Sequence, residues 1–431
     1  MPVKALLCTR GKRLLDHPRF LVTTMVLALV FRVIWVIIFH PSPISDFKDY
    51  FQLASTWAES GTYGTPDTPT AYRPPGYPFL LRLVFGVTGP QVWVGWVLQI
   101  ACSMGIIWLG YLLSLRWWHR PRAARITLIL LAFSPDMLTY SSLLASELWF
   151  TLLLFAGCTT LASPSKNHMA FLRGLFWGAA ALTRPVALLF PLAFFPGFFV
   201  AQKSKSLGPL MKKGALALLG MCLIISPWTL RNQLQLGEKV LISTNGGINL
   251  LIGSYPEASG GWNWNAQLEQ TYLLQDSAPK NEVEKDQLAW QTALEHIQAS
   301  PGRWLLLGFN KWVKTFGRAT SGPDWIRDSY QGIPLSPFQD HLLRMMKGGG
   351  VIFYLIIIAL FIRNLPFHIL RAYSPSTLMN VAGGLWLMAG MSLSIFIFFG
   401  DPRYQFPIIS LMMLYAASGK FCTLAEKRKR T

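Results

Sequence analysis

Two carboxylates stand three residues apart in the stretch ISDFKDYFQLASTW, residues 44–57, directly after an apolar run and a Pro-Ser-Pro corner. Asp46 and Asp49 open a segment, 46–60, in which apolar and polar residues alternate with helical spacing until Gly61. A helix of this kind lies in the plane of a membrane surface. An aspartate at its start can cap the helix or complement its dipole. It can equally accept the proton of an attacking hydroxyl group. Spacing alone leaves both interpretations open.

Three further ionisable residues occupy positions that suggest chemistry. Arg73 lies in AYRPPGYP, Glu147 in LLASELWF, and Arg184 in ALTRP. The prolines of the first motif predict a rigid return towards the membrane, where Arg73 either faces a lipid phosphate or anchors a headgroup. Glu147 and Arg184 fall at the ends of apolar runs, where a charge is costly unless it faces the protein interior or water. They are therefore functional candidates, although mutual pairing or snorkelling would also explain them.

The elements that must position these residues are membrane spans. The chain has 431 residues, of which 52% are hydrophobic and only 14% charged, a composition that excludes a typical soluble domain. Apolar runs recur at the length needed to cross about 30 Å of hydrocarbon. We predict about ten spans, near residues 20–39, 92–115, 122–134, 141–162, 170–182, 185–201, 213–226, 350–363, 378–399 and 404–419.

The distribution of charge predicts the orientation of these spans. The net charge is +19. The segments assigned to the inside hold 22 Lys and Arg against two acids, whereas the rest of the chain holds 17 basic and 18 acidic residues. This bias follows the positive-inside rule and places both termini in the cytoplasm. The basic tail 427–430 then lies beside anionic lipid, and no nucleic-acid partner is expected.

The predicted topology leaves two long outer segments, 40–91 and 227–349. We divide the chain into an N-terminal transmembrane catalytic module (1–226, with the first outer loop at 40–91), an extracytoplasmic domain (227–349), and a C-terminal transmembrane bundle with a basic tail (350–431). In the middle domain, 243–253 (STNGGINLLIG) predicts a turn into a short strand and 281–299 predicts an amphipathic helix. The predicted fold is therefore an all-α polytopic membrane protein with a small mixed α/β outer domain.

Neither a metal nor a cofactor is indicated by the sequence. The seven histidines do not cluster, and no metal-binding spacing is present, although an outer carboxylate pair could bind a divalent cation. The five cysteines fall in predicted spans or on the cytoplasmic side, and the outer segments lack cysteines and glycosylation sequons. These features favour a bacterial cytoplasmic (inner) membrane.

Several motifs occur in order along residues 20–420: an Asp followed four residues later by Tyr, then AYRPPGYP, LLASE, ALTRP, SPWTLRN, STNGGINLLIG and FGDPRYQFP. Together they resemble the bacterial family 39-type members of the C-type glycosyltransferase superfamily, which includes protein O-mannosyltransferases and the aminoarabinose transferases of lipid A. The resemblance implies an inverting transfer of a sugar from a polyprenyl-phosphate donor to a lipid, glycan or protein acceptor at the outer face of the membrane.

The resemblance also assigns roles to residues. Asp46 matches the aspartate at the catalytic centre, although the family often has Asp-Glu where this chain has Asp-Phe, which leaves Asp49 as the alternative base. The late Arg403-Tyr404 pair resembles one found near the donor phosphate. The remaining predicted substrate-binding residues are Tyr50, Arg73, Tyr77, Glu147, Arg184 and Arg231.

Two other functions fit parts of the pattern. A flippase or transporter of lipid-linked sugars would explain many spans and charges in the membrane. It predicts an internal repeat with residues at the midplane, and we see no such repeat. A polymerase or ligase of lipid-linked glycans would share the donor class and the outer-face chemistry.

Overall fold

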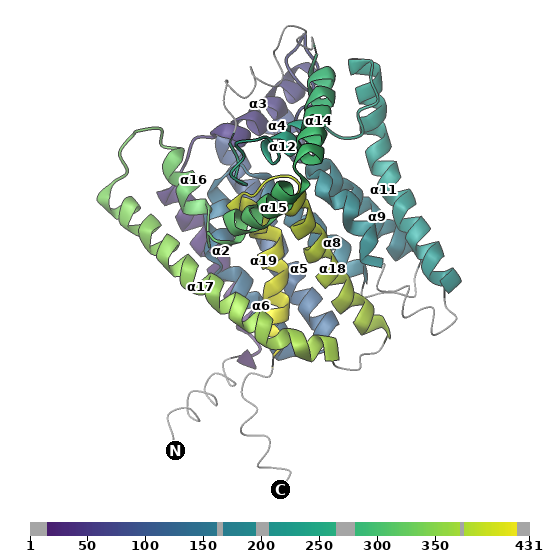
Figure 1. Cartoon of the computed structure of the whole chain (residues 1–431). Coiled ribbons are helices and arrows are strands. Elements are labelled where there is room, and N and C mark those ends of the chain that lie inside the picture. Colours follow the sequence, from purple (N-terminus) through teal and green to yellow (C-terminus); the bar gives the residue numbers. More distant parts are fainter. Residues whose placement is uncertain (1–14, 162–166, 195–206, 264–280, 371–374, 420–431) are drawn as a thin grey trace, which may run out of the picture.

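The computed structural model describes residues 15–161, 167–194, 207–263, 281–370 and 375–419. Within these ranges the chain forms helices, and its extended residues pair only in isolated bridges and do not form β-strands. The all-α architecture predicted from the sequence is therefore confirmed (Figure 1). The helices, in chain order, are α2 (Phe20–Ile38), α3 (Ser45–Ser60), α4 (Gly76–Thr88), α5 (Val92–Trp118), α6 (Pro121–Ala132), α7 (Pro135–Thr139), η1 (Tyr140–Ser142), α8 (Ser146–Leu161), α9 (Asn167–Thr183), η2 (Pro185–Phe194), α11 (Leu207–Leu236), α12 (Gly246–Ile252), α14 (Glu282–Ala299), α15 (Pro301–Phe316), α16 (Gly322–Asp328), α17 (Pro337–Leu370), α18 (Pro375–Ile397), η3 (Pro402–Gln405) and α19 (Phe406–Ala417).

Four of the described helices are long and apolar enough to cross a membrane, judged by length and composition: Phe20–Ile38, Val92–Trp118, Gly208–Leu236 and Pro337–Leu365. The predicted spans at 122–134, 141–162, 170–182 and 404–419 correspond to helices of 12 to 17 residues, and the span at 378–399 corresponds to α18, which has 23 residues. The predicted span at 185–201 begins with the 3₁₀ segment η2 and then leaves the described residues. The number of ten spans stays a prediction.

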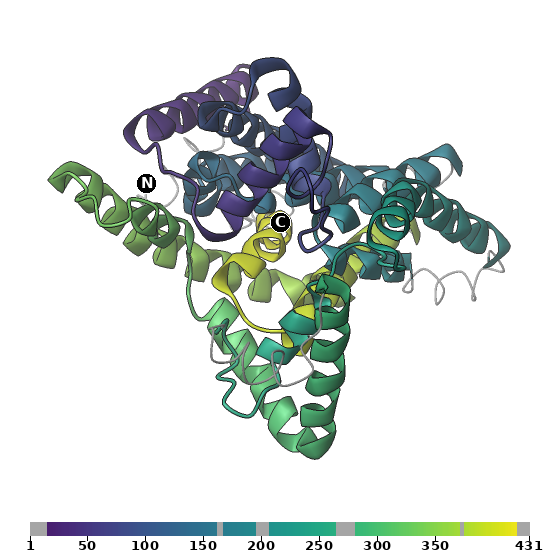
Figure 2. The ribbon, with the colours of Figure 1, turned by 90° about the horizontal axis from the view of Figure 1, so that it is seen from above.

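Helix α19 lies at the centre of the bundle (Figures 1 and 2). Every residue from Phe406 to Ala417 is buried, and the helix packs against α5, α6, α8, α17 and α18. A helix that is apolar all round is stable only when it is surrounded in this way. Because η3 leads directly into this helix, Arg403 lies just before a fully buried element.

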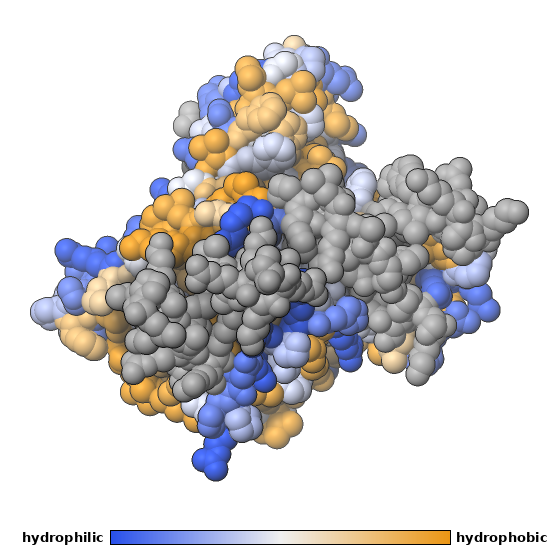
Figure 3. Space-filling view, turned by 90° about the horizontal axis from the view of Figure 1, so that it is seen from below, coloured by the Kyte–Doolittle hydropathy of each residue, from blue (hydrophilic) through white to orange (hydrophobic). Residues whose placement is uncertain are grey.

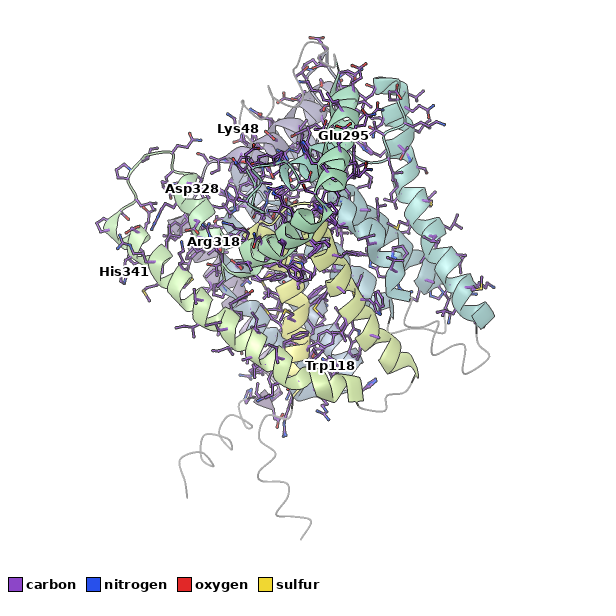
Figure 4. All side chains as sticks on the ribbon, in the orientation of Figure 1. Lys48, Trp118, Glu295, Arg318, Asp328 and His341 are labelled. Carbon is purple, nitrogen blue, oxygen red and sulfur yellow. The ribbon has the colours of Figure 1, made fainter. Side chains whose placement is uncertain are left out.

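The two ends of the bundle differ in the segments that they gather. At one end Asp16 forms ion pairs with Arg122 and Arg125, and Arg120 donates to the carbonyl of Ser418. The beginning of the described chain, the α5–α6 turn and the end of α19 therefore meet there. Figure 4 shows Trp118 at this lower end and Lys48 of α3 at the opposite, upper end. The first predicted outer loop thus lies at the end of the bundle opposite Asp16 and Ser418.

The segment 243–253 corrects one prediction. It was expected to turn into a strand, but it forms helix α12. Gly247 explains the difference, because its N–H donates to Asp286 of α14 at 2.7 Å and a Cβ there would lie 2.1 Å from the Asp286 carbonyl oxygen. The glycine permits two helices to touch instead of making a hairpin. The described part of the predicted outer domain is therefore helical and not mixed α/β.

The predicted helix at 281–299 is confirmed as α14, whose N-cap Asn281 accepts from the N–H groups of Val283 and Glu284. Two other helices run across the expected domain boundaries, since α11 continues past residue 226 and α17 begins before residue 350. The helices α14 and α15 form a lobe that projects from the bundle in Figure 2. In the opposite view, apolar side chains gather on this lobe (Figure 3), and α15 exposes Leu305, Leu306, Phe309 and Val313.

Candidate functional site

The site is built around the carboxylate of Asp46, in the first turn of α3. Its Oδ1 lies 2.6 Å from Nη2 of Arg73, and its Oδ2 lies 2.7 Å from Nη1 of Arg403. The side chain is only 13% exposed. Three segments that are far apart in the sequence therefore supply one buried ion cluster.

Asp46 does not cap its helix. The N-cap position belongs to Ile44, and no side chain caps the helix there. The chain enters α3 through Ser45 at φ 48°, in the left-handed region that residues other than glycine seldom adopt. The interpretation of Asp46 as an N-cap is therefore wrong, because both of its oxygens bind guanidinium groups instead.

Asp49 completes the contacts of Arg73. Its Oδ2 accepts from Nε and Nη2 of Arg73 at 3.1 and 2.9 Å, but its side chain is 44% exposed. The contacts of Asp49 are with Arg73, whereas Asp46 also pairs with Arg403. The sequence left both aspartates as candidates for the base, and the geometry favours Asp46 because it alone faces both arginines.

Contacts made by the backbone at Arg73 and just after it hold this arginine in place. The hydroxyl of Tyr63 donates to the carbonyl of Arg73 at 2.9 Å. Gly76 follows at the start of α4, and a Cβ there would lie 2.4 Å from Oγ1 of Thr183. Only glycine allows α4 to approach the end of α9 this closely, and Thr183 directly precedes Arg184.

Arg403 lies in η3, whose N-cap Asp401 accepts from the Arg403 N–H at 2.9 Å. Its guanidinium lies over the rings of Tyr404 and Trp325, with its carbon 5.5 and 5.9 Å from their centroids. Its Nε is buried and has no hydrogen-bond acceptor among the described residues, since Asp401 Oδ1 is 3.8 Å away. A buried guanidinium thus keeps one donor free.

A second ion pair adjoins the first. Arg184 donates through Nη2 to Oε1 of Glu147, which lies in the first turn of α8 and is 1% exposed. The Arg184 guanidinium also lies over the ring of Tyr404, 5.5 Å from its centroid. The alternative that Glu147 and Arg184 pair with each other is therefore confirmed. Tyr404 lies between two arginines and links the two pairs.

Tyr50 and Tyr77 form the apolar side of the site. Their rings meet edge to face at 5.5 Å, and the Tyr77 hydroxyl accepts from Nε2 of Gln99 at 3.1 Å. Both are buried. The spacing of Tyr50 four residues after Asp46 places the two side chains on the same face of α3.

Arg231 is the predicted site residue that the structure places elsewhere. Its guanidinium donates to the carbonyls of Thr70 and Tyr63 at 2.8 and 2.9 Å and lies over the ring of Trp228. It joins α11 to the loop that precedes Arg73. Its contacts are structural, because they hold the backbone of the first outer segment.

Sequence reasoning missed Asp401 and Trp325 as members of the site and Glu282 as its support. Asp401 is part of the GDPRY motif, whose Asp-Pro pair is a typical helix start. Glu282 accepts from the hydroxyl of Thr70 and the N–H of Ala71, at 2.5 and 2.6 Å. No local pattern predicted Trp325 or Glu282, since both reach the site from the segment 227–349.

Charge governs the protonation of the cluster. Burial alone would raise the pKa of Asp46, but the charges of Arg403 and Arg73 outweigh it and lower this pKa to about 2. With these partners, Asp46 is therefore a stable anion. Among the described residues, no three His, Cys, Asp or Glu side chains gather where they could hold a metal ion.

Comparison with known proteins agrees with this architecture. Residues 72–230 match the model of the family described as dolichyl-phosphate-mannose-protein mannosyltransferase, which confirms the resemblance seen in the motifs. No curated protein sequence matches the chain significantly. The match contains Arg73, Glu147 and Arg184, whereas Asp46 and Arg403 lie outside it.

Several solved structures share the fold at low sequence identity. The oligosaccharyltransferase of Archaeoglobus fulgidus in its apo form is 14% identical, with a TM-score of 0.53, over 93% of this chain and 50% of the archaeal chain. The complex of that enzyme, AglB, with an inhibitory peptide and a dolichol-phosphate is 13% identical, with a TM-score of 0.51, over 92% and 50%. ArnT from Cupriavidus metallidurans bound to undecaprenyl phosphate is 14% identical, with a TM-score of 0.48, over 91% and 78%. This chain thus spans half the length of the archaeal enzyme.

Proposed function

We propose that this protein is an integral-membrane glycosyltransferase that moves a sugar from a polyprenyl-phosphate donor to a lipid, glycan or protein acceptor. The observation that carries the proposal is the buried carboxylate of Asp46 between the guanidiniums of Arg73 and Arg403. One carboxylate and two arginines suit the transfer of a sugar away from a phosphate, because they supply a proton acceptor and a site for the leaving phosphate.

The carboxylate has the role of general base. The acceptor hydroxyl attacks C1 of the sugar on the face opposite the phosphate, and Asp46 takes the hydroxyl proton. The bond from C1 to the phosphate oxygen breaks, and its electron pair stays on the phosphate. Attack from the opposite face inverts the configuration at C1. Asp49 fits this role less well, because it is nearly half exposed and does not contact Arg403.

The arginines have the role of stabilising the leaving group. A guanidinium presents planar pairs of donors that match phosphate oxygens. Charge that develops on the phosphate in a buried site is stabilised more strongly than in water. Arg403 and Arg73 are the residues for this task, and Arg184 adds a third positive charge beside them. Tyr50 and Tyr77 supply an apolar wall for the sugar ring or the prenyl chain.

The comparisons support the donor class. The matching family is described by a dolichyl-phosphate sugar, and a structure with the same fold contains dolichol-phosphate. The charge bias of the loops supports a location in the bacterial inner membrane with both termini in the cytoplasm. The ion cluster lies near the end of the bundle opposite the chain's described ends, which supports an active site at the outer face.

Mass spectrometry of envelope glycolipids and glycoproteins tests this proposal. Cells that lack the protein are complemented with the wild type, with Asp46→Asn or with Asp340→Asn, whose carboxylate also pairs with two arginines but lies on α17. We expect one glycan modification to disappear without the protein and to return with the wild type and Asp340→Asn only. An unchanged glycan profile in cells without the protein would refute the proposed transfer.

A further inference from the structure

The ion cluster poses a problem for Asp46 as a base. Both of its oxygens accept from guanidinium groups at 2.6 and 2.7 Å, and its pKa is about 2, since the nearby arginines outweigh the effect of burial. A general base works best when its pKa lies near the working pH. In the ligand-free protein the carboxylate therefore has little affinity for a proton.

The charges around Asp46 pose a second problem. Three guanidiniums, of Arg73, Arg184 and Arg403, face four carboxylates. These carboxylates belong to Asp46, Asp49, Glu147 and Asp401. Counted at formal charge, the cluster has an excess of one negative charge. A donor phosphodiester brings another negative charge, so that its binding and the charge of Asp46 must influence each other.

Arg403 shows where the phosphate can bind. Its Nη1 binds Asp46, while its Nε is buried and has no hydrogen-bond acceptor among the described residues. A buried donor without an acceptor is unfavourable and marks a place for a missing partner. A guanidinium offers donors on more than one edge. Arg403 can therefore hold the Asp46 carboxylate and a phosphate at the same time.

We propose that the donor phosphate binds the free edge of Arg403 and thereby converts Asp46 from an ion-pair partner into a proton acceptor. This proposal rests on the proposed function and adds that phosphate binding precedes proton transfer to Asp46. The phosphate shares the positive charge of Arg403, so that Asp46 is less stabilised as an anion once the donor is in place. Asp46 then becomes a stronger base once a phosphate is bound at Arg403.

The charges of the reaction fit this arrangement. The acceptor proton moves to Asp46, which changes from −1 to 0. The acceptor oxygen bonds to C1, the bond between C1 and the phosphate oxygen breaks, and the phosphate changes from a diester at −1 to a monoester at −2. The total charge next to Arg403 is the same before and after transfer. Arg403 thus links deprotonation of the acceptor to departure of the phosphate.

Binding equilibria make this coupling measurable. If phosphate binding raises the proton affinity of Asp46, loss of the Asp46 charge must tighten phosphate binding by the same factor. Asp46→Asn is then expected to bind the product better than the wild type does, although it transfers no sugar. A residue that acted as a base without coupling to the phosphate would leave this affinity unchanged.

The experiment measures binding of undecaprenyl phosphate to the full-length, detergent-solubilised protein at pH 8. For Asp46→Asn we expect about tenfold tighter binding than for the wild type, equal to about 1.4 kcal/mol. Asp340→Asn is the matched control, since Asp340 pairs with Arg327 and Arg344 at another place, and Figure 4 shows its neighbour His341 at the far end of α17. Its affinity should equal that of the wild type.

Equal or weaker binding by a folded Asp46→Asn would overturn the inference, and so would equal tightening by Asp340→Asn. Folding is checked by the thermal unfolding midpoint. If Asp46→Asn does not fold, Asp401→Asn replaces it, because asparagine keeps the N-cap bond to Arg403 and removes the negative charge that lies 3.8 Å from its Nε. Asp401→Asn should tighten binding as well, and its failure to do so would refute the coupling. A wild type that binds no undecaprenyl phosphate would refute the proposed function too.

Discussion

Replacing Arg403 by lysine separates the geometry of the guanidinium from its charge. In the protein, Arg403 uses Nη1 for Asp46, keeps Nε free, and lies over the rings of Trp325 and Tyr404. Lysine can reach one oxygen of Asp46 but cannot bind a second group along a planar edge. The variant therefore keeps the positive charge and loses the bridge.

The expected loss of activity follows from the number of hydrogen-bond donors that the substitution removes. Loss of one donor that stabilises developing charge costs about 10²–10³ in kcat. Because lysine preserves the charge, we expect a smaller loss in kcat/KM of about 30- to 100-fold, which corresponds to about 2–3 kcal/mol. Stability should change little, since the lysine keeps Asp46 as an ion partner.

The assay is consumption of a polyprenyl-phosphate sugar by the purified, detergent-solubilised protein at equal concentration. Arg344→Lys is the matched control, because its guanidinium pairs with Asp340 and is 73% exposed, where an ion pair contributes about 0–1 kcal/mol. Full activity of Arg403→Lys would show that only a positive charge is needed there. The bridge between Asp46 and the phosphate would then be refuted.

Four further predictions test other parts of the argument. Asp49→Asn should keep most of the transfer activity, whereas loss in this variant alone would move the role of base to Asp49. Gly76→Ala should lower both activity and the unfolding midpoint, because its Cβ would lie 2.4 Å from Oγ1 of Thr183 and overpacking costs about 1–3 kcal/mol; a neutral result would contradict the close approach of α4 and α9. Burial lowers the pKa of Lys311 to about 7, so the unfolded chain binds more protons than the folded one between pH 7 and the ordinary lysine range, and stability should rise with pH there. The unfolding midpoint of Lys311→Met should therefore rise less between pH 7 and pH 9.5 than that of the wild type. Topology reporters fused after residues 65 and 402 should report the outer side and one after residue 120 the cytoplasm; an outer signal at 120 would overturn the orientation.

The sequence predicted the positions of the helices better than it predicted the contacts between them. Apolar periodicity located α2, α3, α5 and α14 to within a few residues, since that pattern depends on neighbours along the chain. The segment 243–253 was predicted wrongly, because its helix depends on the contact of Gly247 with α14. Tertiary packing decided the structure there, and no local pattern reports it.

The candidate site shows the same division. The motifs that resemble the glycosyltransferase family pointed to Asp46 and Arg403, and Arg73 was a candidate because it lies in AYRPPGYP. It could not show that they meet, since they are separated by 27 and by more than 300 residues. It also grouped Arg231 with them, although that arginine binds backbone carbonyls. A charged residue in a loop has the same sequence pattern in either role.

The segment 227–349 contributes the Trp325 ring that lies against the Arg403 guanidinium, and it also contacts the loop that precedes Arg403. These contacts are made to the backbone of the loop. Gly400 donates to the carbonyl of Gly260 at 2.8 Å. Buried Lys311 donates to the carbonyl of Ile397 at 2.8 Å.

Gln405 secures the other side of Arg403, because it donates to the carbonyl of Arg318 in the same segment. Each of these contacts ends on a backbone carbonyl, and two of them begin at a side chain, of Lys311 or Gln405, so no local motif in 227–349 predicts them. They fix where η3 begins, while the buried helix α19 fixes where it ends. The position of one guanidinium relative to Asp46 is thus set from both directions. A shift of about 1 Å in a catalytic group can cost about 10²-fold in rate. For the transfer proposed above, the contacts of segment 227–349 therefore matter because they hold Arg403 in register with Asp46.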